Sequence, residues 1–330
     1  MPEAAEMSVF TTLQDYYKHT QRVTTASESR IVHCLNPFRA KPGSEHDKAQ
    51  RVTFASMTHA RSVARQLRPE LEIRFVKVTD AHEISSALIA FDDHRRLERT
   101  IMDLANFNIP RPLPIMMDIL TATPIQPDDI FVFTNVDIAV VPGFYGFLEE
   151  IFARGADCAI INRRTISGIY KDERDLPLMA CETGSAHPGF DCFAFRGRLR
   201  EALLPFNSCI GIGGVMLPLV HQLLARAERP VVLLDAHATY HLGDDRQWLS
   251  EAFADYAVHN WREVDRIFRA LLEDPVIADS MVRRLSQAHE PWIFPPKLRA
   301  LAGLPAPPSP FRRNRRAQRL KSLTCKILRR

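Results

Sequence analysis

The stretch Asp128-Asp-Ile-Phe-Val-Phe-Thr-Asn-Val-Asp-Ile138 decides the fold that the sequence predicts. Its residues 130–133 form a short apolar run rich in β-formers, which is typical of a strand buried on both faces of a sheet. The run stops at polar residues that include Asn135 and Asp137. Polar side chains that follow a buried strand lie at the carboxyl edge of the sheet, where open α/β sheets bind their ligands.

The Asn-x-Asp arrangement of residues 135–137 allows two interpretations. It can present two oxygen ligands on one side of a turn, which suits a hard divalent cation that also holds a diphosphate. Alternatively, it is an Asx-turn that closes an ordinary loop after the strand, because Asn and Asp are favoured in turns. These three residues alone leave both interpretations open.

The composition is that of a globular α/β protein. A length of 330 residues suits one large domain with additions or two domains, and 46% hydrophobic residues permit a sizeable core. No apolar run approaches the roughly 20 residues that a membrane helix needs. The acidic start Met1-Pro-Glu-Ala-Ala-Glu6 does not resemble a signal peptide. The six cysteines form no C-x-x-C pair, which favours free thiols and a cytoplasmic location.

The positive charge of the chain is concentrated in residues 311–330, which contain nine Lys or Arg and no acid. Without these nine, 34 basic residues face 39 acidic ones, a net charge of about −5. We therefore expect no nucleic-acid partner for the body. The apolar residues of the tail recur near helical spacing. This indicates either a basic amphipathic segment that binds an anionic membrane surface or a disordered tail.

Strand and helix patterns alternate along the first half of the chain and mix in the second. The predicted strands are 30–35, 71–78, 130–133, 157–161, 191–195 and, as the last, 230–234. The predicted helices are 47–67, 92–107, 115–121, 144–154, 211–227, 261–273 and 276–288. This order predicts a three-layer α/β domain with a mixed, largely parallel sheet and helices on both faces.

The same patterns suggest the domain boundaries. We expect an N-terminal lead-in over 1–29, a catalytic domain over 30–250, a helical extension over 251–290, a Pro-rich linker over 291–310 and the basic tail over 311–330. Seven prolines between residues 291 and 310 are expected to interrupt regular structure there.

The order of features over residues 30–250 resembles that of the GT-A glycosyltransferases, in particular family-2-like bacterial members with a degenerate Asp-x-Asp motif. The matching pieces are Asn36-Pro37, Asp80, Leu113-Pro-Ile-Met-Met-Asp118, Thr134-Asn-Val-Asp137, His187-Pro-Gly-Phe-Asp191 and His241-Leu-Gly-Asp-Asp-Arg246. The resemblance implies the Rossmann-like GT-A fold. It also implies a hexosyltransferase that moves a sugar from a nucleotide-diphosphate sugar to a glycan or lipid-linked acceptor. The first carboxylate of the motif is replaced by Asn135, which leaves one anionic ligand.

The resemblance assigns roles on the donor side. Mn²⁺ or Mg²⁺ would neutralise the leaving diphosphate, with Asp137 and His241 as its ligands. Asn135 would touch the ribose or a metal-bound water. The expected donor contacts are Asn36, Pro37, Asp80, Arg111, Asp118 and Asn135. The alternatives are loop capping for the residues at strand ends, solvated surface charges for Arg111 and Asp118, and a satisfied loop histidine for His241.

On the acceptor side, an inverting transferase needs a base for the acceptor hydroxyl proton. Asp191 is the expected base and His187 the second candidate, because the Pro188-Gly189 turn can direct both into one cavity. Alternatively, Asp191 caps a turn. The expected acceptor contacts are Arg163, Arg164, Asp244, Asp245 and Trp248. The two arginines are otherwise a solvated pair, and Trp248 is otherwise a core residue.

Three other functions are consistent with parts of the sequence. A sugar-phosphate nucleotidyltransferase needs a Gly-rich phosphate loop after the first strand, but residues 36–43 contain one glycine. A metallohydrolase is disfavoured because no tight motif such as H-x-x-x-H is present. A catalytically inactive relative that binds a glycan or nucleotide at the membrane surface stays open because of Asn135.

Overall fold

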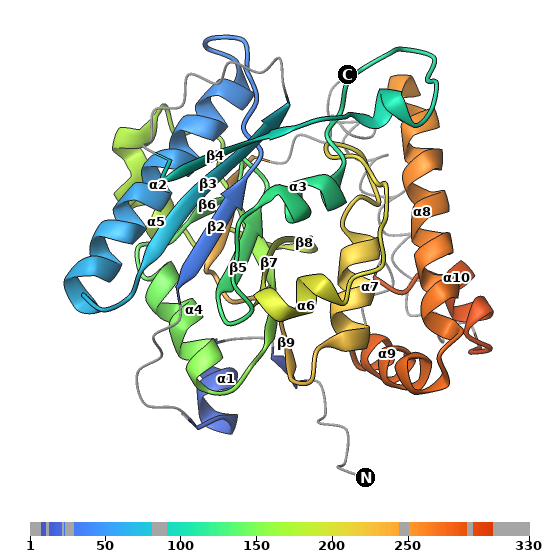
Figure 1. Ribbon diagram of the computed structural model, residues 1–330. Coiled ribbons are helices and arrows are strands. Elements are labelled where there is room, and N and C mark those ends of the chain that lie inside the picture. The colour runs from blue at the N-terminus through green and yellow to red at the C-terminus, as the bar shows by residue number, and fades with distance from the viewer. Residues whose placement is uncertain are drawn as a thin grey trace, which may run out of the picture. The chain divides into compact units, whose positions relative to one another are not determined.

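The computed structural model describes residues 8–10, 13–21, 23, 30–80, 91–243, 251–288 and 293–305 (Figure 1). The chain divides into a large unit, residues 1–293, and a second unit, residues 294–330. In the second unit the structure describes helix α10 (Pro296–Leu301). The prediction that prolines exclude regular structure there is wrong for these six residues, because a proline in the first helical turn needs no N–H partner.

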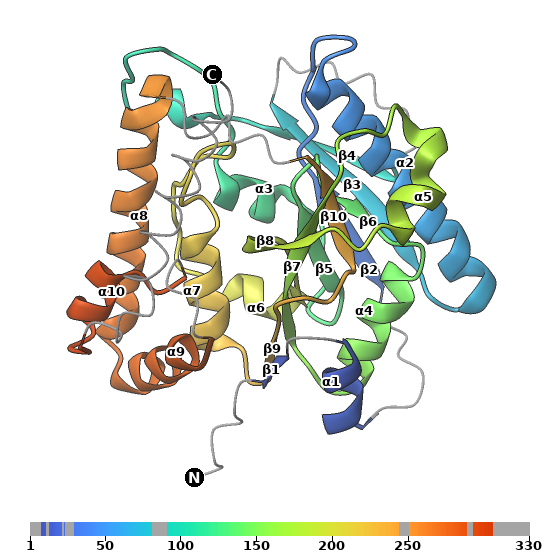
Figure 2. The same ribbon diagram turned by 180° about the vertical axis from the view of Figure 1, so that it is seen from behind.

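A mixed sheet runs through the large unit. Its main strands lie in the order β1 (Ser8–Phe10), β9 (Pro230–Leu233), β7 (Cys158–Ile166), β8 (Ser185–Arg196), β5 (Ile130–Thr134), β2 (Ile31–Leu35), β3 (Ile73–Asp80) and β4 (Asp93–Leu97). Strand β10 (Thr239–Leu242) pairs with β7 and with the short β6 (Ala139–Val140), as Figure 2 shows. Only β8 with its two neighbours and the β6–β10 pair are antiparallel among these described strands. The predicted mixed, largely parallel sheet is confirmed.

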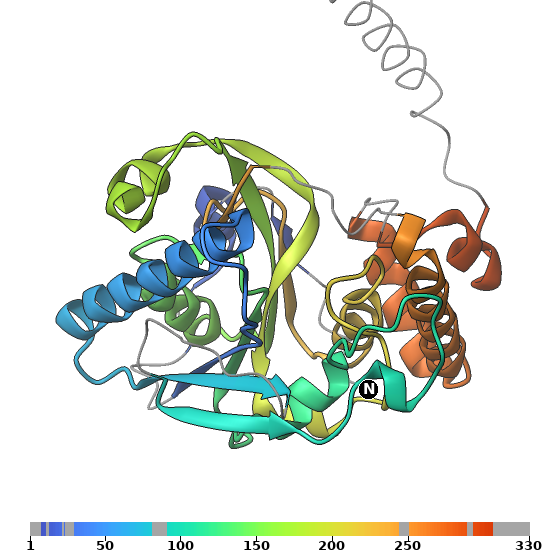
Figure 3. The same cartoon turned by 90° about the horizontal axis from the view of Figure 1, so that it is seen from above.

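Helices cover both faces of this sheet, which completes the predicted three-layer α/β fold (Figure 3). One face carries α2 (Glu45–Leu67) and α4 (Phe144–Ala153). The other carries α3 (Met116–Ala122) and α7 (Leu217–Arg226), and α7 packs against α8 (Ala254–Leu272) and α9 (Pro275–Ala288). The shorter helices are α1 (Leu13–His19), α5 (Leu176–Cys181), α6 (Gly197–Glu201) and the 3₁₀ turns η1 (Ile101–Asp103), η2 (Glu173–Asp175) and η4 (Glu251–Phe253).

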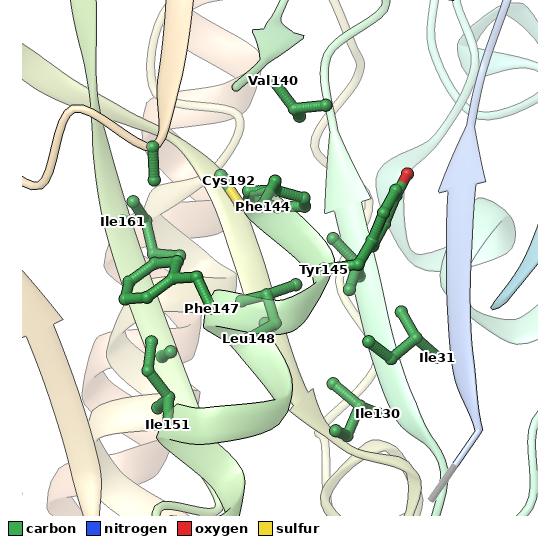
Figure 4. Close-up of a cluster of buried hydrophobic side chains, with 14 of the residues drawn as sticks. Ile31, Ile130, Val140, Phe144, Tyr145, Phe147, Leu148, Ile151, Ile161 and Cys192 are labelled. Carbon is green, nitrogen blue, oxygen red and sulfur yellow. The ribbon is translucent and has the colours of Figure 1, made fainter. Parts of the chain in front are cut away.

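The core explains why β5 forms where the apolar run predicts it. All residues of β5 are buried. Ile130 and Val132 belong to the cluster beneath α2 and α4, part of which Figure 4 shows. Phe131 contacts Phe195 of β8, with ring centroids 4.9 Å apart. Burying one such side chain contributes roughly 1.5–3 kcal/mol, so β5 is held firmly and its end is a rigid position for polar residues.

Several segments differ from their predicted structure. The predicted helix over 92–107 is wrong, because residues 93–97 form the edge strand β4 and residues 101–103 the turn η1. Charged residues suit an edge strand, where they block further pairing. Strand β9 is not the last strand, since β10 follows it. In the predicted helix 211–227, only Leu217–Arg226 is helical, and the preceding residues form turns.

The described part of the chain contains no helix long and apolar enough to cross a membrane. Its cysteines carry free thiols, and four of them are buried: Cys34, Cys158, Cys192 and Cys209. Burial raises the pKa of the Cys34 thiol to about 12, so this thiol is protonated at neutral pH.

Candidate active site

The polar residues after β5 are presented by a tight turn. The backbone N–H of Ile138 donates to the carbonyl of Asn135 over 3.1 Å, and the chain then enters β6. The turn therefore places Asn135 and Asp137 at the carboxyl edge of β5, as the sequence predicts.

The pairing of β6 with β10 brings His241 to this turn. Tyr240 of β10 lies opposite Ala139 of β6, and the next residue, His241, reaches Asp137. Oδ2 of Asp137 lies 3.3 Å from Nε2 of His241. Nδ1 of His241 donates to the carbonyl of Gly243 over 2.9 Å. Because Nδ1 carries a proton, Nε2 of the neutral ring is the atom that can accept a proton or bind a metal.

Each member of this pair favours the charged form of the other. Burial by itself would raise the pKa of Asp137, but the hydrogen bond and charge of His241, with the charge of Arg163, hold it below its usual value. Burial by itself would lower the pKa of His241, but Asp137 raises it above its usual value. Oδ1 of Asp137 is buried and has no hydrogen-bond partner among the described residues.

A second contact network adjoins the pair and centres on Asp191 of β8. Nδ2 of Asn135 donates to Oδ1 of Asp191 over 3.0 Å. Nε of Arg163, on β7, lies 3.3 Å from Oδ2 of the same carboxylate. The charge of Arg163 acts on both Asp137 and His241, so the network and the pair lie close together. The turn after β5 and strands β7, β8 and β10 thus bring together predicted residues that are far apart in the sequence.

Arg164, although adjacent to Arg163, is engaged elsewhere. Its guanidinium is bound by the carboxylate of Asp235 and by the carbonyls of Thr183 and Gly184. These contacts hold the segment between β7 and β8 against the sheet. The structure gives Arg164 this fixing role, and no contact between it and the Asp137–His241 pair is seen among the described residues.

His187 lies near the start of strand β8, so the predicted turn at Pro188-Gly189 is wrong, because residues 185–196 form a strand. Its Nδ1 accepts the backbone N–H of Gly189 over 2.8 Å, and its carbonyl accepts a hydrogen bond from Asn162 of β7. Oδ1 of Asn162 is buried without a hydrogen-bond partner in the described part. Sequence reasoning did not select Asn162. The available signal is that this amide directly follows the apolar run of β7.

The other predicted donor contacts have partners of their own. Nδ2 of Asn36 donates to the carbonyl of Val78 over 2.7 Å, beside the buried Pro37. Asp80 ends β3 at the same carboxyl edge. These residues lie at the carboxyl edge that the sequence predicts. Asn36 and Pro37 follow β2, which is next to β5, and Asp80 ends β3, which is next to β2.

Arg111 and Asp118 make contacts of their own, away from the Asp137–His241 pair. The guanidinium of Arg111 lies over the ring of Phe253, 4.6 Å from its centroid. Asp118 receives two hydrogen bonds from Arg99, at 2.8 and 2.9 Å. No described contact joins either residue to Asp137 or His241. The predicted acceptor contacts Asp244, Asp245 and Trp248 lie outside the described residues.

The residues present fit a divalent cation that is shared with a ligand. Asp137 offers a buried oxygen without a partner, and His241 offers Nε2 with its other nitrogen fixed on a carbonyl. No group of three or more metal-ligating side chains occurs in the described ranges. Mg²⁺ is often held by one or two protein ligands together with substrate phosphates, so a two-residue site suits that mode of binding.

The solved structures to which this chain is similar include sugar-nucleotide enzymes. One of them is S. aureus TarS, residues 1–349, in complex with UDP-GlcNAc (TM-score 0.43, 14% identity, covering 78% of this chain and 73% of that one). The 4-diphosphocytidyl-2C-methyl-D-erythritol synthase from Anaerococcus prevotii has a TM-score of 0.32, 14% identity and coverage of 72% and 100%. The galactosyltransferase LgtC with donor and acceptor sugar analogs has a TM-score of 0.31, 10% identity and coverage of 71% and 96%.

No protein-family model and no curated protein sequence matches the chain. At TM-scores below 0.5, the likeness to solved structures carries no conclusion about function.

Proposed function

We propose that the protein is a GT-A nucleotide-sugar glycosyltransferase that moves a sugar from a nucleotide-diphosphate sugar to a hydroxyl of a glycan or lipid-linked acceptor. The observation that carries this proposal is the pairing of Asp137 with His241 at the carboxyl edge of β5. Their facing atoms lie 3.3 Å apart, and the second oxygen of Asp137 is buried and unpartnered in the described part. Ligands of open α/β sheets bind at this edge.

The charges of the site favour a cation there. A histidine has to be neutral to bind a metal, and with His241 neutral, Asp137, Asp191 and Arg163 together carry one net negative charge. A diphosphate would be repelled by this balance unless positive charge is added. Bound Mn²⁺ or Mg²⁺ would supply that charge and stabilise the leaving diphosphate, with Asp137 and His241 as its ligands.

In the transfer itself, the acceptor oxygen forms a bond to the anomeric carbon of the sugar while the bond from that carbon to the diphosphate oxygen breaks. The hydroxyl proton has to go to a base. Asp191 is the proposed base. Its oxygens face Asn135 and Arg163, and a carboxylate oxygen with one donor keeps a further lone pair for a proton. His187 is the second candidate.

We also propose that the enzyme works in the cytoplasm, against the inner face of the membrane, with residues 311–330 on the anionic lipid surface. The charge and apolar spacing of that segment support this proposal. A lipid-linked acceptor would be reached most readily from such a position.

One observation favours a second candidate function, a non-catalytic relative that binds a nucleotide or glycan. Asp137 and His241 pair with each other, so each has a charged partner without any ligand. The replacement of the first motif carboxylate by Asn135 points the same way.

Thermal unfolding with a panel of nucleoside diphosphates and nucleotide sugars, each with and without Mn²⁺, tests the proposal. A ligand that binds only the folded state stabilises that state and so raises the melting temperature. At a ligand concentration of 100 times its Kd, the unfolding free energy increases by about 2.7 kcal/mol. We expect a Mn²⁺-dependent shift with one nucleotide class, and release of the diphosphate from the corresponding sugar donor. A shift without any donor turnover would favour the non-catalytic relative. No shift with any nucleotide would contradict the transferase and would leave a non-catalytic relative that binds a glycan.

A further inference from the structure

Two adjacent arginines of β7 have opposite environments. Arg164 is bound by a carboxylate and two backbone carbonyls, as described above. Nε of Arg163 is buried and has no hydrogen-bond partner among the described residues. Its nearest partner is Oδ2 of Asp191, 3.3 Å from Nε, at ion-pair distance but without hydrogen-bond geometry.

The side chain of Arg163 is nevertheless only 11% exposed. A buried Nε–H without an acceptor is costly, because it has lost hydration without gaining a hydrogen bond. The charge of the guanidinium also cannot be removed by deprotonation at ordinary pH. An arginine kept in this state is therefore arranged for an anionic ligand with several acceptor oxygens, which its planar fork can bind through two parallel hydrogen bonds.

The position of Arg163 identifies the ligand group. Asp191 fixes the guanidinium from one side, and the Asp137–His241 pair lies within reach of its charge. We infer, given the proposed function, that the guanidinium of Arg163 binds the diphosphate of the sugar donor. Asp191 positions it there. The donor diphosphate would then lie between the guanidinium of Arg163 on β7 and the cation that Asp137 and His241 are proposed to bind.

This inference changes the expected role of Arg163 from acceptor contact to donor anchor. It also separates Arg163 from Arg164, whose contacts secure the segment between β7 and β8. If Arg163 binds the diphosphate, it contributes more to the binding of a charged nucleoside diphosphate than to the binding of the uncharged nucleoside. If Arg163 only supports the fold, it contributes to stability and does not distinguish between the two ligands.

The test compares Arg163→Gln and Arg163→Lys with the control Arg174→Gln. Arg174 is an exposed arginine of η2 that pairs with Asp172, so the same substitution there removes a charge away from the site. Calorimetry measures the Kd of the nucleoside diphosphate selected by the thermal panel and of its parent nucleoside, at two salt concentrations. Melting temperatures verify that each variant is folded.

We expect Arg163→Gln to weaken diphosphate binding by about 10- to 100-fold, the range for a charged hydrogen-bonded contact. Nucleoside binding is expected to stay unchanged. Arg163→Lys should retain part of the affinity, because the charge remains while the fork is lost, and it serves if the Gln variant does not fold. Diphosphate binding in Arg163→Gln should also depend less on salt.

The experiment distinguishes failure of the diphosphate anchor from failure of the proposed function. Equal diphosphate affinity in the wild type and both Arg163 variants overturns the anchor and leaves the transferase proposal standing. Equal losses for diphosphate and nucleoside also overturn it, because they indicate a distorted pocket. A wild-type protein that binds no nucleotide overturns the proposed function and the anchor together.

Discussion

Oδ2 of Asp137 lies 3.3 Å from Nε2 of His241, and each residue stabilises the charged form of the other. The two residues are 104 positions apart in the sequence and meet because β6 pairs with β10. We propose that this carboxylate and this imidazole, with a further buried carboxylate oxygen beside them, serve as a preorganised pair of ligands for a cation.

The first prediction concerns this pair. Asp137→Asn and His241→Ala should each weaken the Mn²⁺-dependent part of nucleotide binding by about 10- to 100-fold, because each removes one of two protein ligands. The readout is the thermal shift with nucleoside diphosphate, with and without Mn²⁺. Asp128→Asn is the matched control, since that carboxylate is exposed and contacts only Arg198, at 4.0 Å, among described ion pairs. An undiminished Mn²⁺ titration in His241→Ala would remove this histidine from the site.

The second prediction addresses Asp191. As the proposed base, it should lower kcat by about 10²- to 10⁴-fold when changed to Asn, with a smaller change in KM. The amide can still accept the hydrogen bond from Asn135, so the turn after β5 should persist. Release of nucleoside diphosphate from the sugar donor measures turnover. Asp279→Asn, at an exposed carboxylate of α9, is the control. Full turnover in Asp191→Asn would show that another group takes the proton.

The third prediction is a loss of stability in mild acid that arises in the core. Burial lowers the pKa of His33 to about 3 and that of His221 to about 4. In the unfolded chain both rings take up protons near pH 6.5, whereas the folded protein does not until the lower pKa values. Stability is therefore full above about pH 6.5 and falls below it, by up to about 1.4 kcal/mol per pH unit for each histidine.

Urea unfolding at pH 7, 6 and 5 measures this loss. His221→Gln can keep the hydrogen bond that Nε2 donates to the carbonyl of Ile293, at 2.8 Å. This variant should take up one proton fewer when it unfolds in acid, so its stability should depend less on pH. His59→Gln, at an exposed histidine, is the control. An unchanged acid dependence in His221→Gln would contradict the assignment.

The fourth prediction compares two glycines. A Cβ on Gly197, the first residue of α6, would lie 2.0 Å from the carbonyl oxygen of Gln126, in the turn that leads into β5. Gly197→Ala should destabilise the protein by about 1–3 kcal/mol, because backbone has to move. Gly146, within α4, has open space around a Cβ, so Gly146→Ala should stabilise by about 0.5–1 kcal/mol. Equal unfolding free energies for the two variants would refute this packing difference.

The sequence predicts the central strand well because one physical signal determines it. A continuous apolar run between polar turns can be satisfied only by burial on both faces, and β5 is buried throughout. Strand β4 is the opposite case. Its residues Asp93-His-Arg-Arg-Leu97 carry no apolar alternation, and only the free edge of β3 makes them a strand.

The site could be predicted only in part, for a related reason. The end of β5 follows from the apolar run, so the place of Asn135 and Asp137 could be predicted. The contact of Arg163 with Asp191 depends on irregular register between β7 and β8, near Asn162. No residue type in the sequence indicates such a bulge. The sequence therefore predicted the same role for Arg163 and Arg164. The predicted donor and base roles themselves remain predictions.

The fifth prediction concerns the basic tail, residues 311–330, which lies outside the described residues. The full chain should sediment with vesicles that contain anionic lipid, because each basic residue near such a surface contributes about 1 kcal/mol. Removal of residues 311–330 should abolish this binding, and zwitterionic vesicles should bind neither form. Equal sedimentation of both forms would exclude the tail as an anchor.

The most direct test of the central claim is the affinity of Mn²⁺ for the protein alone and for the protein saturated with nucleoside diphosphate, measured by calorimetry. If Asp137 and His241 share the ion with the diphosphate, Mn²⁺ should bind weakly to the protein alone and at least about tenfold more tightly with the nucleotide. The nucleotide should gain from Mn²⁺ by the same factor. Equal Mn²⁺ affinity in both states would contradict a metal-assisted transferase site at the end of β5.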